Sequence, residues 1–184
     1  SPGFYPGFYK NNLDYVAPSK LEDVVTESSD FGKILRAPYK ANLANRILLE
    51  YGPNKLKFIR KSISAFFEFT QFYIDVGPKI SIYKTAEDYL SKNKTDLIVA
   101  TGDPFVLFHY ANKLSKKFNI PWVADYRDPW SHDISNERNI LLKLLNTYNE
   151  KKIVNKAKFV ITVSEFVKEQ ISKLITKKIY VIPN

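Results

Sequence analysis

The chain has 184 residues, of which 45% are hydrophobic and 15% aromatic, a composition that excludes intrinsic disorder and fits one domain with a sizeable core. No apolar run approaches the roughly 18 residues that span a bilayer, and the absence of cysteine excludes a disulfide framework and a thiolate site. Lysine and arginine total 28 against 19 acidic residues, and the resulting net charge of +9 favours anionic partners.

The first part of the chain predicts few regular elements. Residues 10–30 are polar and weakly patterned, so we expect a loop with a short helix near 21–25. Residues 33–38 (KILRAP) predict a strand, and residues 41–51 predict a helix that ends at Gly52 and Pro53.

Residues 55–74 predict a helix with an unusually wide apolar surface. Its apolar side chains cover an arc of about 220°, whereas a surface helix needs a stripe of roughly 100°. Either the rest of the chain or a membrane surface must cover the extra face. In the second case this is an interfacial helix, and six aromatic and basic side chains are expected to contact lipid: Phe58, Phe69, Phe72, Lys57, Arg60 and Lys61.

Residues 95–132 contain the clearest pattern in the sequence. The apolar run at 96–100 (DLIVA) is too short for a helix and predicts a buried strand. Apolar residues at 105–118 follow helical spacing, and residues 122–124 start a second buried strand after Pro121. A strand, helix and strand of these lengths predict a right-handed crossover between parallel strands.

The same alternation continues along the chain. We expect helices at 80–90, 136–154 and 164–175, and strands at 159–163 and 179–182. The fold class that follows is α/β, with a parallel sheet flanked by helices. In the helix at 136–154, six apolar residues are expected to line the buried side: Ile140, Leu141, Leu144, Leu145, Tyr148 and Ile153.

Polar clusters follow the first two strands of this sheet. Ligands of open parallel sheets bind outside the carboxyl ends of the strands, so we expect residues 101–103 and 125–132 to converge on one cleft. Arg127 lies between two carboxylates, Asp125 and Asp128, and can hold them by charge-assisted hydrogen bonds. Carboxylates accept hydrogen bonds from sugar hydroxyls, which predicts a sugar site; the alternative is a salt-bridge cluster that only fixes the loop.

Four segments of the chain resemble one enzyme family: TGDPF, NIPWVADYRDPW, AKFVITVSEFVKEQI and KKIYVIPN. They are similar to the amino-terminal domain of bacterial family-4-like glycosyltransferases with the GT-B architecture, and the likeness covers residues 31–184. It implies a Rossmann-like acceptor-side domain over 1–184, ending before the linker to a donor-binding domain. The family's first strand, glycine-rich loop, helix and second strand are not found before Lys33, so we expect the chain to be cut there.

The resemblance implies a retaining transferase that moves a sugar from a nucleotide-sugar to a glycan or lipid-linked acceptor. Arg127 and Asp128 occupy the place of a His-Asp pair in many relatives and are the expected catalytic residues, with Asp128 positioning the substrate. We expect no metal and no cofactor apart from the donor, which the second domain holds. The expected substrate-binding residues are Thr101, Gly102, Asp103, Asp125, Tyr126, Trp130, His132, Ser164 and Glu165.

Two other functions fit the sequence less well. A sugar-nucleotide epimerase shares the GT-B architecture, but the DYRDPW cluster favours the transferase. A non-catalytic basic and aromatic module could bind a membrane or nucleic acid, although the basic residues are scattered over several helices, which counts against nucleic acid. For the transferase we expect a bacterial enzyme of surface polysaccharide synthesis, located in the cytoplasm or on the inner membrane surface.

Overall fold

The computed structural model of the protein describes residues 16–131 and 140–183. The chain divides into two compact units, Ser1–Tyr89 and Leu90–Asn184, and we describe each unit by itself. His132, a predicted site residue, lies outside the described residues.

The first unit contains a two-stranded hairpin made of β1 (Val25–Ser29) and β2 (Gly32–Arg36). The strands pair antiparallel, with Val25 opposite Arg36 and Ser29 opposite Gly32. The helix predicted near 21–25 does not form: residues 21–24 are irregular, and β1, whose residues are all exposed, begins at Val25. A strand without a buried face shows no alternation of apolar residues, which is why the sequence pattern does not reveal it.

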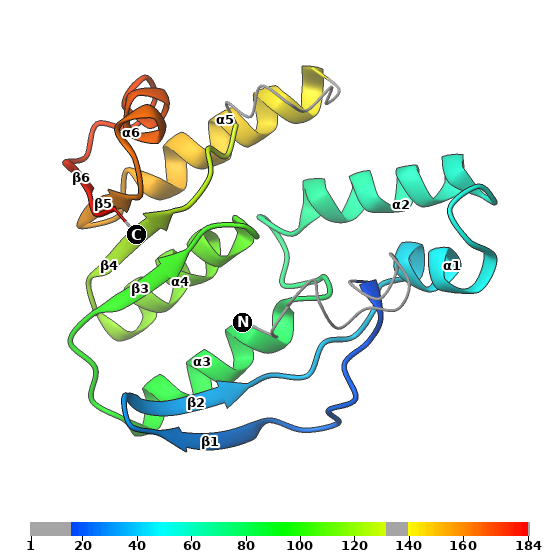
Figure 1. The fold of residues 1–184 in the computed structure, drawn as a ribbon, viewed down its shortest axis with the longest axis horizontal. Coiled ribbons are helices and arrows are strands. Elements are labelled where there is room, and N and C mark those ends of the chain that lie inside the picture. Colours follow the sequence, from blue (N-terminus) through cyan, green and yellow to red (C-terminus); the bar gives the residue numbers. More distant parts are fainter. Residues whose placement is uncertain (1–15, 132–139, 184) are drawn as a thin grey trace. The chain divides into compact units, whose positions relative to one another are not determined.

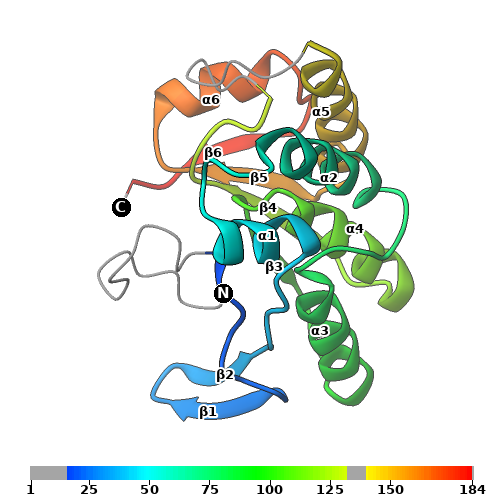
Figure 2. The same ribbon diagram turned by 90° about the vertical axis from the view of Figure 1, so that its right-hand side faces the viewer.

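Two helices of the first unit, α1 (Leu43–Tyr51) and α2 (Lys57–Thr70), pack against each other (Figure 2). Asn42 caps α1, because its side-chain oxygen accepts a hydrogen bond of 2.8 Å from the Asn45 amide. The next helix, α3 (Ile80–Lys92), leads into the second unit (Figure 1).

The end of α2 corrects the prediction for one aromatic residue. The sequence predicts a helix as far as residue 74, but α2 ends at Thr70, and Gln71 is its C-cap. Phe72 therefore leaves the face that it would occupy in a continued helix, and it is only 7% exposed. The predicted membrane contact of Phe72 is wrong, because its ring belongs to the core.

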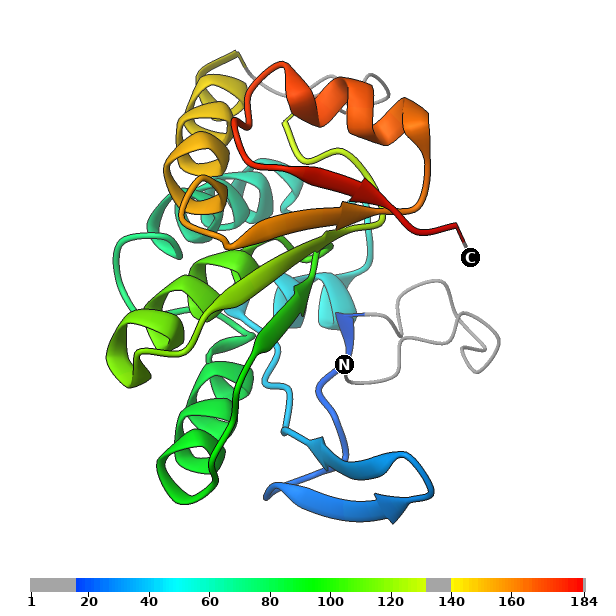
Figure 3. The ribbon, with the colours of Figure 1, turned by 90° about the vertical axis from the view of Figure 1, so that its left-hand side faces the viewer.

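The second unit has a four-stranded parallel sheet in the order β3-β4-β5-β6 (Figure 3, from green to red). Its strands are β3 (Ile98–Thr101), β4 (Trp122–Tyr126), β5 (Phe159–Thr162) and β6 (Ile179–Val181). Three helices alternate with them: α4 (Val106–Phe118), α5 (Ile140–Val154) and α6 (Glu165–Ser172). The predicted α/β class and the parallel sheet flanked by helices are confirmed.

Strand β3 lies at one edge of this sheet. Within 16–131 and 140–183, the part of the chain that the structure describes, β4 is its one strand neighbour. The strand predicted at 33–38 is β2, which pairs with β1 in a separate sheet. The strand predicted at 33–38 is therefore not part of the parallel sheet.

Helix α5 is oriented differently from the prediction. Ile140 and Leu141 are 72% and 70% exposed, and Leu144 and Tyr148 are exposed as well, so of the expected apolar side only Ile153 is buried. Polar residues take the inward positions, because hydrogen bonds to the neighbouring strand and loop hold this side of the helix. The buried residues repeat at helical spacing: Asn146, Asn149, Glu150, Ile153 and Val154.

The core of the second unit is an aromatic cluster between α4 and β4. The Phe108 ring is fully buried and lies 4.9 Å from the Tyr126 ring and 6.0 Å from the Trp122 ring, measured between centroids. Trp130 stacks on Phe105 at 5.1 Å with an angle of 3° between the ring planes. Each buried aromatic ring removes a large apolar surface from water, so this cluster holds α4 on the sheet.

None of the helices in the described ranges is both long and apolar enough to cross a lipid bilayer.

Replacing Phe108 by alanine tests the aromatic cluster. We expect the free energy of unfolding to fall by about 3–5 kcal/mol, because the change removes a buried ring and leaves a cavity. Phe166→Ala, at an exposed phenylalanine of α6, is the matched control and should change the free energy by less than about 1 kcal/mol. Urea denaturation measures both values, and equal losses for the two variants would contradict the assignment of Phe108 to the core.

Candidate active site

The ends of β3 and β4 bring the two predicted polar clusters together. The strands are in register with Thr101 opposite Asp125. The Thr101 hydroxyl donates a hydrogen bond of 2.9 Å to Oδ2 of Asp125, and the Gly102 amide donates one of 2.7 Å to the Asp125 carbonyl. Residues 101 and 102 therefore lie beside Asp125 at the ends of the two strands, while the cleft that was expected between the two clusters stays a prediction.

Asp125 also fixes the position of Arg127. The Nε group of Arg127 donates to the same Oδ2 atom at 3.2 Å. The Asp125 side chain is 8% exposed and that of Arg127 is 44% exposed, so the carboxylate lies inside the protein while the guanidinium reaches the surface. Asp128 is exposed in the same loop. Asp125 therefore positions Arg127, and among the described residues of this loop the exposed charged groups are Arg127 and Asp128.

The turn after β3 explains why position 102 is a glycine. A Cβ atom on Gly102 would lie 2.7 Å from Cε1 of Phe105 and 3.0 Å from Cζ of Phe108. The glycine is thus required by the close approach of two rings. The left-handed conformation occurs at Asp103, with φ of 55°. Asp103 is exposed at this turn.

Two predicted binding residues are buried aromatic residues. Tyr126 is fully buried, and Trp130 is 4% exposed with one face stacked on Phe105. A direct contact between either ring and a sugar is not compatible with this burial. Both side chains instead support the loop that carries Arg127 and Asp128, because they anchor its two ends in the aromatic cluster.

A buried carboxylate that the sequence analysis missed anchors the same loop. Glu150 of α5 accepts a hydrogen bond of 3.0 Å from the Tyr126 hydroxyl and one of 3.1 Å from the Ser131 amide. Burial raises the pKa of Glu150 above its ordinary value, and the hydrogen bonds from Ser131 and Tyr126 partly oppose that rise. The sequence pattern gives no signal for it, because Asn146, Asn149 and Glu150 form a polar side of α5, which such a pattern assigns to solvent.

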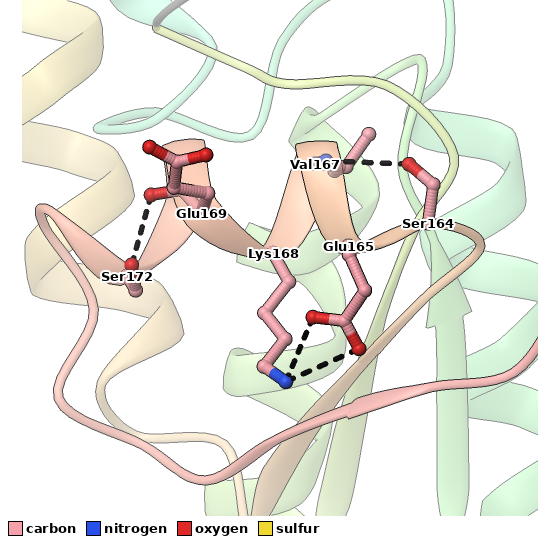
Figure 4. Close-up of polar contacts among 6 residues, drawn as sticks. All are labelled: Ser164, Glu165, Val167, Lys168, Glu169 and Ser172. Carbon is pink, nitrogen blue, oxygen red and sulfur yellow. Dashed lines mark hydrogen bonds and ion pairs between the residues drawn. The ribbon is translucent and has the colours of Figure 1, made fainter.

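Ser164 and Glu165 begin α6, directly after β5. The Ser164 hydroxyl accepts a hydrogen bond of 3.3 Å from the Val167 amide, so Ser164 is the N-cap of α6 (Figure 4). Glu165 forms an ion pair of 2.9 Å with Lys168. Glu165 and Lys168 also line an open pocket that continues along α6 to Lys177 and Ile179. A substrate-binding role for Ser164 and Glu165 stays a prediction.

The described residues give no support for a metal centre. No group of three or more histidine, aspartate or glutamate side chains within 16–131 and 140–183 is placed to hold a metal ion.

The sequence was compared with protein families, with curated proteins and with solved structures. The family whose model matches is Glycosyltransferase Family 4, over residues 46–184. No curated protein and no solved structure matches the chain.

The raised pKa of Glu150 predicts how stability depends on pH. The folded protein binds the Glu150 proton more tightly than the unfolded chain, so this group favours folding most below its unfolded pKa, near 4.5. Its contribution is lost as the pH rises from there through the raised folded value. We expect the free energy of unfolding of the protein to fall relative to Glu150→Gln over this window. In that variant the amide oxygen can still accept from Ser131, and the Tyr126 hydroxyl can accept from the amide nitrogen.

Urea denaturation at a series of pH values measures this difference. Glu169→Gln removes a carboxylate from an exposed position of α6 and is the matched control. Glu150→Ala should lower the free energy of unfolding by about 1–3 kcal/mol at neutral pH, because the Ser131 amide and the Tyr126 hydroxyl lose their acceptor. A difference between the protein and Glu150→Gln that stays constant with pH would contradict the prediction.

Proposed function

The chain belongs to Glycosyltransferase Family 4, and from this we propose that it is the acceptor-side domain of an enzyme that transfers a sugar from a nucleotide-sugar to a glycan or lipid-linked acceptor. The observation that carries the proposal is the set of hydrogen bonds that joins Thr101, Asp125 and Arg127 at the carboxyl ends of β3 and β4. This edge is where open parallel sheets bind their ligands.

The exposed groups at this edge suit recognition of a sugar or a phosphate. Arg127 offers donors that are held in place by Asp125, and a guanidinium pairs well with phosphate oxygens. The Asp128 carboxylate can accept hydrogen bonds from sugar hydroxyls. In this proposal Arg127 and Asp128 touch the transferred sugar or its phosphate, and Thr101 and Asp125 position Arg127.

We expect the reaction to retain the configuration of the anomeric carbon, as the family resemblance implies. The bond between that carbon and the donor phosphate oxygen breaks, and a bond to the acceptor oxygen forms on the same face of the sugar. The departing phosphate takes the acceptor proton, so the protein need not supply a general base. Asp128 therefore acts by orienting the sugar. The nucleotide is expected to bind mainly to a second Rossmann-like domain, and the present domain alone is expected to be inactive.

The biological setting that we propose is synthesis of a bacterial surface polysaccharide or a lipid-linked glycan at the cytoplasmic face of the inner membrane. The support for it is the net charge of +9, which suits acidic lipid headgroups and phosphate-bearing sugars.

Asp128→Asn tests the role of the exposed carboxylate. In an enzyme that contains this domain, we expect turnover to fall by about tenfold to a hundredfold, because a misplaced substrate reacts slowly. The thermal unfolding midpoint should stay the same, since Asp128 is exposed. The assay follows release of the nucleoside diphosphate from UDP- and GDP-sugars.

Asp96→Asn is the matched control for this prediction. Asp96 is also exposed, but it precedes β3 and therefore lies at the amino end of the sheet. Its replacement should leave turnover unchanged. Normal turnover of Asp128→Asn, or loss of the fold in that variant, would show that the loop has only a structural role.

A further inference from the structure

Helix α2 of the first unit exposes several large apolar side chains on one side. None of its residues is buried, and Phe58 and Phe69 are 85% and 52% exposed. Phe58, Ile59, Phe66 and Phe69 repeat at helical spacing over about three turns of α2. The Tyr73 ring, in the turn after the helix, lies 5.8 Å from the Phe69 ring. We call these side chains the apolar stripe: Phe58, Ile59, Phe66, Phe69 and Tyr73.

Helix α1 packs on α2 and leaves the stripe exposed. Ile63 and Phe67, which are half-buried, lie on a different side of α2 from Phe58 and Phe69, as the period of 3.6 residues requires. Arg60 points to this inner side, because its guanidinium donates a hydrogen bond to the Pro53 carbonyl. Arg60 is therefore tied to the turn before α2 and does not take the lipid-contacting position that the sequence predicts for it.

Lysine side chains border the apolar stripe. Lys57 and Lys61 are exposed and lie one helical turn apart, on the side of α2 next to Phe58. Residues 55–74 contain four basic residues and one acidic residue. The surface thus combines exposed aromatic rings with a positive border, which is the composition of helices that lie in a lipid interface.

We propose that α2 docks on an anionic lipid bilayer. The helix lies in the plane of the membrane surface, the apolar stripe enters the boundary between headgroups and acyl chains, and Lys57 and Lys61 contact the negative headgroups. An anionic bilayer matches both features of this surface. The exposed rings alone would suit any apolar partner, whereas the lysines beside them favour a partner that carries negative charge next to its apolar part. The inference does not depend on the site at β3 and β4.

Flotation with vesicles tests the proposal on the full chain. The protein should float with vesicles of 70% phosphatidylcholine and 30% phosphatidylglycerol, and much less with pure phosphatidylcholine. Phe58→Ser with Phe69→Ser should lower the partition coefficient by about tenfold or more, since both rings lose their burial in the interface. Lys57→Gln and Lys61→Gln should each lower it by about fivefold, as expected for one basic residue near an anionic surface.

A matched control variant separates docking through α2 from general adsorption of a basic protein. Phe166→Ser removes a ring that is 59% exposed on α6, and it should leave flotation unchanged. Equal binding of the protein and of Phe58→Ser with Phe69→Ser, with circular dichroism showing both folded, would overturn the proposal.

An added tryptophan at position 58 reports directly whether the helix enters the membrane. The two native tryptophans, Trp122 and Trp130, are buried, so a tryptophan at position 58 would be the exposed one. Emission of Phe58→Trp should shift to shorter wavelength on anionic vesicles and be quenched by brominated lipids, whereas Phe166→Trp should show neither change. Flotation of Phe58→Trp without a shift would mean that another surface binds the vesicles, and the proposal would fail.

Discussion

The stack of Phe105 on Trp130 is the contact on which the candidate site depends. Phe105 follows the turn after β3, and Trp130 lies in the loop after β4, so one pair of rings ties both loops to the same core. The ring of Phe108 fills the space beneath them and contacts Tyr126 at the end of β4. Dispersion and hydrophobic burial thus fix the positions of the two loops. Hydrogen bonds between the polar groups of the site then orient the side chains that these loops carry.

The buried carboxylate of Glu150 fixes the path of the loop that follows β4. The Glu150 carboxylate accepts hydrogen bonds from Tyr126 and Ser131, at the two ends of the segment that contains Arg127 and Asp128. A carboxylate is costly to bury, and it is tolerated here because donors face both of its oxygens. The arrangement resembles that of Asp125, whose buried carboxylate accepts from Thr101 and Arg127. Two inner carboxylates therefore hold the exposed pair in place.

The sequence predicted the second unit better than the first. Buried strands such as β4 and β5 are short apolar runs, and turn residues separate them from helices, so the strands and their parallel pairing followed from the pattern, whereas their order in the sheet did not. The hairpin of β1 and β2 was partly missed, because an exposed pair of strands has no apolar face to detect. The side of α5 that is buried was misjudged because hydrogen bonds, which a hydrophobic pattern does not contain, decide its orientation.

The site was predictable to a similar, limited degree. The convergence of Thr101 and Asp125 followed from the geometry of parallel strands, whereas the burial of Tyr126 and Trp130 depends on ring contacts that only coordinates show. Gly102 illustrates the difference well. The sequence analysis expected it to bind substrate, but the structure shows that a side chain there would meet the rings of Phe105 and Phe108.

The position of β3 at the edge of the sheet has a consequence for assembly. In the described part of the chain, one side of β3 carries backbone amide and carbonyl groups that pair with no other strand, next to the 55% exposed side chain of Val99. Such an edge is a template for any extended segment of suitable register. The sheet can therefore grow by one strand on this side without any change to β4, β5 or β6, and a neighbouring polypeptide that supplies that strand would become continuous with the core.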